Sequence, residues 1–138
     1  MFSKIRDNLY LSSHSSIKFR NIEESRINVI VNVANEISSP SFKKVASYQC
    51  GFDDNIKEAE KHTDQITAFV NQLLDEGKKV LVHCNHGASR SPHIVASVLS
   101  ERENKSYDES YQEVRSLHPR AMELSIGEEI KGSSIWKK

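Results

Sequence analysis

The strongest structural signal in the chain is the run Val80-Leu81-Val82-His83-Cys84-Asn85-His86-Gly87-Ala88-Ser89-Arg90-Ser91-Pro92. Its first four residues are apolar apart from His83, which is typical of a short buried strand. Pro92 suits the first turn of a helix. Behind it, apolar residues recur on one helical face, namely Ile94, Val95, Val98 and Leu99. The run therefore predicts a strand, a loop with five residues between Cys84 and Arg90, and a helix.

Strands and helices are predicted to alternate along the rest of the chain. The other strands are short runs of mainly apolar or β-branched residues at 8–11, 27–34 and 45–50. The other helices are predicted at 17–25, from 56 to a stop at Gly77, at 106–117 and from 125 onward. Their expected end signals are Ser16, Gly77, and capping boxes at Ser106 and Ser125. This alternation predicts one α/β domain over residues 1–138, with helices on both faces of its sheet.

Composition excludes several classes of protein. Nineteen basic and 19 acidic residues leave no net charge, so no basic surplus favours nucleic acid or an anionic membrane. No apolar run approaches the roughly 20 residues that span a bilayer. Two cysteines exclude a disulfide framework or a Cys-rich zinc site, and no metal-ligand spacing is found. We expect a soluble, cytoplasmic monomer without a metal or cofactor.

The loop after Cys84 has the composition of an anion site. A tight connection from strand to helix turns backbone N–H groups inward, and the helix N-terminus adds partial positive charge. Gly87 permits dihedral angles that a side chain would forbid. Arg90 offers a planar fork that holds two phosphate oxygens. These surroundings favour the thiolate form of Cys84.

A thiolate at the floor of a phosphate-sized cup can attack phosphorus and form a phosphocysteine, which water then hydrolyses. The departing oxygen needs a proton from an acid, which afterwards serves as the base for water. Asp53 and Asp54, just after a predicted strand, are both candidates for this general acid.

With these residues, the sequence resembles the dual-specificity branch of the cysteine-based protein tyrosine phosphatases. The resemblance spans nearly the whole chain and rests on residues 8–11, 27–33, the Asp53–Asp54 loop, the long helix, 80–84 and 89–92. It implies a central mixed sheet of about five strands flanked by helices. It also implies hydrolysis of phosphotyrosine and of phosphoserine or phosphothreonine in protein substrates.

The resemblance further assigns roles to individual residues. Cys84 would be the nucleophile, Arg90 the phosphate clamp, and Ser91 the hydroxyl that helps the thiolate depart. His83 would hold the cysteine through hydrogen bonds. Alignment of the long helix favours Asp53 over Asp54 as the acid. The amides expected to bind phosphate belong to Asn85, His86, Gly87, Ala88, Ser89 and Arg90.

Two departures and two side roles stay open. Many relatives carry a Pro-Asn-x-Gly-Phe pattern near the carboxyl terminus, where this chain reads 120–127 differently, which puts that pocket wall in question. The segment with which larger tyrosine-specific phosphatases recognise their substrate is not identifiable, which favours a shallow cup. Asn32 either braces the active loop or is a polar strand end. His86 either selects a partner or is solvated.

Other functions use similar residues. The five-residue loop and the serine after Arg90 disfavour a rhodanese-like sulfurtransferase. A low-molecular-weight tyrosine phosphatase shares the loop spacing but carries the loop at its amino terminus, whereas here it comes after about sixty percent of the chain. A phosphoinositide or RNA 5′-phosphatase, and a noncatalytic phosphate-binding module, are the alternatives kept. Cys50 could form a regulatory disulfide with Cys84, if their strands flank one another, or be an unreactive buried thiol.

Overall fold

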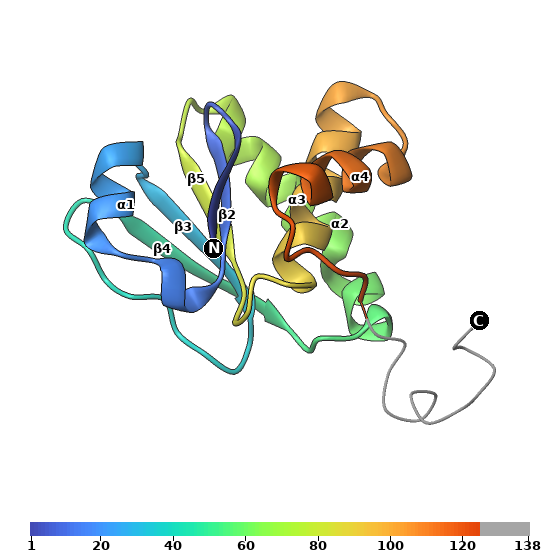
Figure 1. The fold of residues 1–138 in the computed structure, drawn as a ribbon, viewed down its shortest axis with the longest axis horizontal. Coiled ribbons are helices and arrows are strands. Elements are labelled where there is room, and N and C mark those ends of the chain that lie inside the picture. The colour runs from blue at the N-terminus through green and yellow to red at the C-terminus, as the bar shows by residue number, and fades with distance from the viewer. Residues whose placement is uncertain (125–138) are drawn as a thin grey trace.

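A five-stranded mixed sheet forms the centre of the fold (Figure 1). The computed structural model describes residues 1–124. The strands are β1 (Phe2–Arg6), β2 (Leu9–Ser12), β3 (Val29–Ala34), β4 (Ala46–Phe52) and β5 (Val80–His83). They lie in the order β1-β2-β5-β3-β4, and only the β1–β2 pair is antiparallel. The predicted mixed sheet is confirmed.

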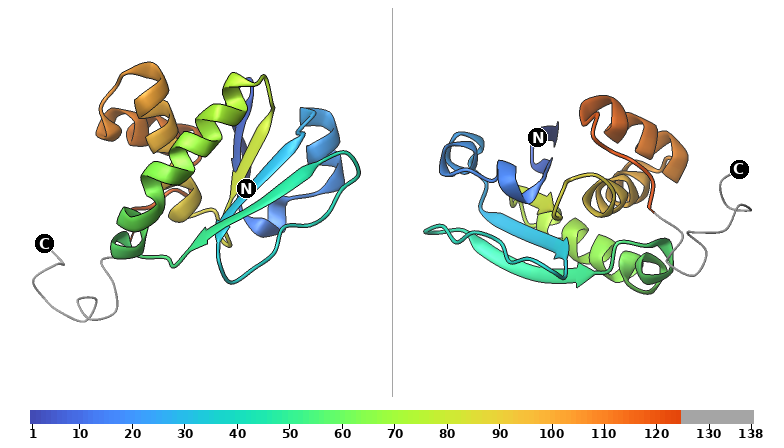
Figure 2. Two further views of the ribbon diagram at one scale, coloured as in Figure 1. Left: turned by 180° about the vertical axis from the view of Figure 1, so that it is seen from behind. Right: turned by 60° about the horizontal axis from the view of Figure 1, so that its bottom comes forward.

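Helices cover both faces of this sheet, as predicted (Figures 1 and 2). They are α1 (Phe19–Ser25), α2 (Ile56–Asp75), α3 (Arg90–Glu103) and α4 (Tyr107–Leu117). Ile22 of α1 packs in one apolar cluster with Ile30 and Leu81. Val31 and Val82 point to the other face and belong to the larger cluster under α2, α3 and α4. None of the described helices is long and apolar enough to cross a bilayer.

The parallel strands bring three loops to one edge of the sheet. His83, the last residue of β5, pairs with Ser12 on one side and with Asn32 on the other. Ala34 at the end of β3 pairs with Phe52 at the end of β4. Because the carboxyl ends of parallel strands share one edge, the segments after β3, β4 and β5 meet there.

Two predicted helix signals are confirmed within the described residues. The side chain of Ser106 accepts from the Glu109 N–H at 3.0 Å, and Glu109 reaches back to the Ser106 N–H, which completes a capping box. Pro92 lies in the first turn of α3. The predicted box at Ser125 lies outside the described residues.

Three local predictions are corrected. Helix α1 begins at Phe19, not residue 17, because the Ser16 hydroxyl is engaged by Ser13 and by the terminal amine. Strand β1 was not predicted, because charged residues interrupt its buried positions, Ser3 and Ile5. Strand β4 continues through Gly51, where a Cβ would lie 2.6 Å from the backbone of the segment after β3, so only glycine fits.

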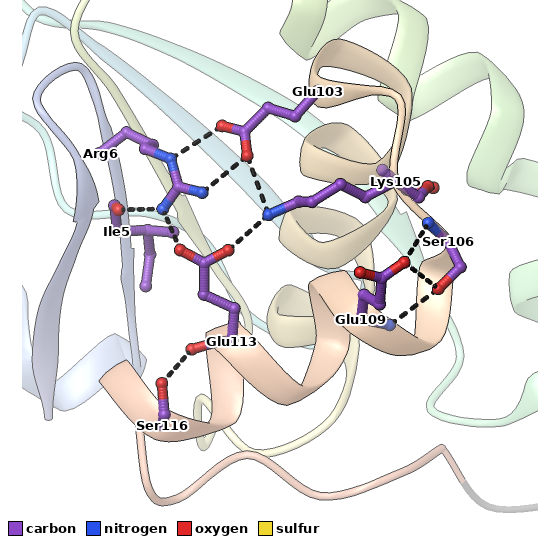
Figure 3. A network of polar contacts seen from close by, with 9 residues as sticks. Ile5, Arg6, Glu103, Lys105, Ser106, Glu109, Glu113 and Ser116 are labelled. Carbon is purple, nitrogen blue, oxygen red and sulfur yellow. Dashed lines mark hydrogen bonds and ion pairs between the residues drawn. The ribbon is translucent and has the colours of Figure 1, made fainter.

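A polar network ties β1 to α3 and α4 (Figure 3). Arg6 donates to both carboxylate oxygens of Glu103 at 2.8 Å and lies 2.8 Å from Glu113. Lys105 bridges Glu103 at 3.0 Å and Glu113 at 2.6 Å. The Arg6 guanidinium, followed by Lys105, holds the pKa of Glu103 at about 2, below its ordinary 4.5.

We expect Glu103→Gln to lower the free energy of unfolding near pH 7 by about 1 kcal/mol, which is typical of partly exposed ion pairs. A carboxyl whose pKa is lowered by folding stabilises above its ordinary pKa of 4.5, and the effect is lost as pH falls toward about 2. The difference between variant and wild type should therefore shrink on acidification. Urea unfolding across this range measures it, with the exposed Glu101→Gln as the control. A difference in unfolding free energy that stays constant with pH would contradict the stabilising role of the Glu103 carboxylate.

Candidate active site

Residues 84–89 form the loop that joins β5 to α3 at the shared sheet edge. Cys84 is buried, with 2% of its surface exposed. Gly87 has a φ of +68°, and a Cβ there would lie 2.7 Å from the Ser13 backbone nitrogen, so only glycine fits this turn. Ala88 and Ser89 lead directly into α3, whose N-terminus therefore faces the loop. His86, in the same loop, is exposed, which agrees with a solvated side chain.

Cys84 is held between a serine and a histidine. The Ser91 Oγ lies 3.2 Å from Cys84 Sγ. His83 Nδ1 donates to the Cys84 carbonyl at 3.1 Å, and its Nε2 accepts from the Ser39 hydroxyl at 2.8 Å. Burial lowers the pKa of His83 to about 4, so the ring is neutral near pH 7. The structure therefore places the predicted residues Ser91 and His83 next to Cys84. It adds Ser39, which the sequence did not suggest.

Arg90 is buried and fixed on two of its three nitrogens. Nη1 donates to the Phe52 carbonyl at 2.9 Å and to Glu36 at 2.7 Å, and Nη2 donates to Glu36 at 2.5 Å. Its Nε is buried and has no hydrogen-bond partner within the described part of the chain. An unpaired buried donor is unfavourable, so the site is suited to an anion that would accept from it.

Glu36 is a site residue that the sequence did not suggest. The Arg90 hydrogen bond holds the pKa of Glu36 at about 2, so its carboxylate is charged near pH 7. Asn32 donates to the Ile37 carbonyl at 2.7 Å and accepts from the Ala34 N–H at 2.9 Å. Asn32 therefore braces the loop that carries Glu36. The available signal was position, because Glu36 lies two residues after the end of a buried parallel strand.

Asp53 and Asp54 follow β4, but they face different groups. Asp54 accepts from the Ser89 hydroxyl at 2.5 Å, next to Arg90. Asp53 accepts from the Asn35 amide at 2.5 Å, on the neighbouring loop. Of the two aspartates, Asp54 is therefore the one that contacts the loop over residues 84–90.

Cys50 is not placed to form a disulfide with Cys84. Strand β3 lies between β4 and β5, so the premise that their strands flank one another is wrong. Two strand spacings are roughly 10 Å, whereas a disulfide needs Cα atoms within about 7 Å. Burial also raises the pKa of the Cys50 thiol, which disfavours its reactive form. The cysteine pair would need backbone movement to join.

The sequence matches the family described as "Dual specificity phosphatase, catalytic domain" over residues 9–126. This chain belongs to the dual-specificity phosphatase family. Among curated relatives, dual specificity protein phosphatase 12 of Rattus norvegicus is 27% identical over 123 residues, covering 86% of this chain. Dual specificity phosphatase 28 of Mus musculus is 29% identical over 94 residues, covering 67% of this chain and 58% of that protein. The chain spans only 36% of the rat relative.

Solved structures of dual-specificity phosphatases share the fold. A crystal structure of a mouse putative dual specificity phosphatase matches with a TM-score of 0.80 at 24% identity, covering 88% of this chain and 78% of that one. Human DUSP28 matches with a TM-score of 0.80 at 20% identity, covering 98% and 90%. The predicted phosphatase-like architecture is thereby confirmed.

Proposed function

We propose that this domain hydrolyses phosphomonoesters on proteins through a phosphocysteine intermediate. The observation that carries the proposal is the buried Cys84 beside Ser91, at the start of a loop that ends at Arg90 with an unpaired Nε. Loop amides, the α3 N-terminus and Arg90 would together hold the dianionic phosphate. Binding of this kind needs neither metal nor cofactor.

The proposed reaction has two steps. The Cys84 thiolate attacks phosphorus, the bond to the leaving oxygen breaks, and that oxygen takes a proton from an aspartic acid. Water, deprotonated by the same aspartate, then attacks the phosphocysteine and releases inorganic phosphate. Ser91, at 3.2 Å from Sγ, would donate a hydrogen bond to the departing thiolate.

For the general acid, the contacts favour Asp54, although the alignment favoured Asp53. Asp54 contacts Ser89 of the phosphate loop, whereas Asp53 contacts Asn35. We expect Asp54→Ala to slow an alkyl phosphate roughly 10²- to 10⁴-fold, the usual contribution of a general acid. It should slow p-nitrophenyl phosphate far less, because nitrophenolate leaves without a proton. Asp53→Ala is the matched control, and the reverse pattern would return the role to Asp53.

Protein substrates are favoured over lipid or RNA phosphates. The side chains between Cys84 and Arg90 include no lysine or arginine that would bind extra phosphates. Beside Glu36, a polar groove of about 390 Å³ could receive residues that flank a phosphorylated side chain. We infer that phosphotyrosine and phosphoserine or phosphothreonine peptides are substrates. A single domain, a monomeric state and a cytoplasmic location remain proposals from the sequence.

The test is a substrate panel with purified wild-type protein. It contains matched phosphotyrosine and phosphothreonine peptides, a phosphoinositide and a 5′-phosphorylated RNA. Peptide hydrolysis that exceeds lipid and RNA hydrolysis would support the proposal. A preference for lipid or RNA would contradict the proposed protein substrates and favour a phosphoinositide or RNA 5′-phosphatase. Phosphate binding without turnover of any substrate would indicate a noncatalytic module.

A further inference from the structure

We propose that His118 is a positioning residue that aims one amide of the phosphate loop at the substrate. The proposal rests on the function proposed above and extends it to a residue outside the loop. His118 directly follows α4 and is fully buried. Its side chain connects the loop to β1, which is the outermost strand of the sheet and pairs with β2.

Two short hydrogen bonds determine the state of the ring. The Nε2 atom of His118 lies 2.7 Å from the Gly87 carbonyl oxygen. Because a carbonyl only accepts, Nε2 carries the proton. On the other side, Nδ1 lies 2.7 Å from the Ser3 hydroxyl, which therefore donates to it. Burial lowers the pKa of His118, so this neutral form is the one present near pH 7.

The contact with Gly87 fixes a whole peptide plane. The Gly87 carbonyl and the Ala88 N–H belong to one planar trans peptide unit, in which the two groups point in opposite directions. A carbonyl that is held outward by His118 therefore turns the Ala88 N–H inward, toward the phosphate position. Inward N–H groups are what an anion-binding nest requires.

Neighbouring planes are held in the same way, but by the backbone. The His14 N–H donates to the Asn85 carbonyl at 2.9 Å, and the Met122 N–H donates to the Ala88 carbonyl at 2.6 Å. By the same geometry these contacts turn the amides of His86 and Ser89 inward. Of these three outward contacts, only that of His118 comes from a side chain. A substitution can therefore remove it without altering the backbone.

His118→Leu and His118→Gln separate this role from simple packing. Leucine fills space but donates nothing, whereas the glutamine side-chain amide can place an N–H close to the position of Nε2. The readouts are the inhibition constant of orthovanadate and kcat for p-nitrophenyl phosphate, together with the urea midpoint of each variant. We expect His118→Leu to weaken orthovanadate binding roughly 10- to 100-fold, as for one hydrogen bond to a charged group, and His118→Gln to recover most of it.

His93 supplies the matched control. It also bridges two elements, with Thr63 at 2.9 Å and Tyr107 at 2.8 Å from its ring nitrogens, and neither contact involves the loop. His93→Leu and His93→Gln should change the urea midpoint without changing orthovanadate binding. Equal orthovanadate binding by wild type and folded His118→Leu would overturn the proposal. Equal weakening in His118→Leu and His118→Gln would do the same.

Ser3→Ala keeps the proposal testable if His118→Leu does not fold. This variant removes only the hydroxyl that fixes Nδ1. We expect weaker orthovanadate binding, with a changed Ala88 amide proton resonance in the free protein; an unchanged resonance and affinity would contradict the proposal. Wild type that binds orthovanadate without hydrolysing any ester would refute the proposed function alone, since the His118 series is scored on binding.

Discussion

Cys84→Ser should abolish hydrolysis of p-nitrophenyl phosphate, with a loss in kcat of roughly 10⁴-fold or more, as for the removal of other catalytic nucleophiles. A serine hydroxyl is far less acidic than a thiol and is a weaker nucleophile, so the variant has no comparable group to attack phosphorus. The variant should still bind orthovanadate, because the backbone of the loop and Arg90 are unchanged. Steady-state kinetics and an inhibitor titration measure the two effects.

Cys50→Ser is the matched control for that result. Cys50 lies on β4 and is separated from β5 by β3. We therefore expect nearly unchanged kcat in this variant. Activity that survives in Cys84→Ser, or that disappears in Cys50→Ser, would contradict the assignment of the nucleophile.

Arg90→Lys should lower kcat/KM roughly 10²- to 10³-fold, which is typical of the loss of a preorganised donor to the transition state. A lysine keeps the positive charge but not the planar fork. It cannot keep the hydrogen bonds to Glu36 and Phe52 and also leave a separate N–H free for phosphate, the role proposed for the unpaired Nε of the guanidinium. Kinetics with a phosphotyrosine peptide measure this loss.

The controls for Arg90 test whether the fork itself matters. Arg102 lies on the same helix, and its guanidinium pairs with Asp75 at 2.8 Å, outside the loop. Arg102→Lys should therefore leave kcat/KM unchanged. Glu36→Gln should give a smaller loss than Arg90→Lys, because it disturbs the arginine without removing it. An Arg90→Lys enzyme as active as wild type would show that charge alone suffices.

Much of the fold could be predicted because its signals are local. Strand β5 and helix α2 were predicted correctly, since the apolar run before His83 and a long helical period each lie within one segment. Strand β1 was missed because Lys4 and Arg6 alternate with its buried residues. The predicted cap at Ser16 was wrong because Ser13 and the terminal amine hydrogen-bond to the Ser16 hydroxyl. The amine lies 15 residues away in sequence and comes close to Ser16 only in the folded chain.

The candidate site likewise contains residues that a local motif predicts and residues that only the fold brings together. Cys84, Arg90 and Ser91 are close in sequence, so one loop motif was enough to predict them. Glu36 contacts Arg90 across 54 residues, and His118 contacts Gly87 across 31. These pairings depend on the strand order, which no local pattern specifies. Asp53 and Asp54 are adjacent, and the turn geometry after β4 determines which of them faces the loop.

In the proposed mechanism, the phosphoryl group is transferred to Cys84 before water releases it. Ser91→Ala tests this transfer most directly, because loss of the hydroxyl 3.2 Å from Sγ should slow the second step more than the first. Mixed rapidly with p-nitrophenyl phosphate and quenched in acid, this variant should give a burst of nitrophenol close to the enzyme concentration. Peptide mass analysis should find one phosphoryl group on the peptide that contains Cys84. No burst, with no phosphoryl group on Cys84 during turnover, would contradict the mechanism.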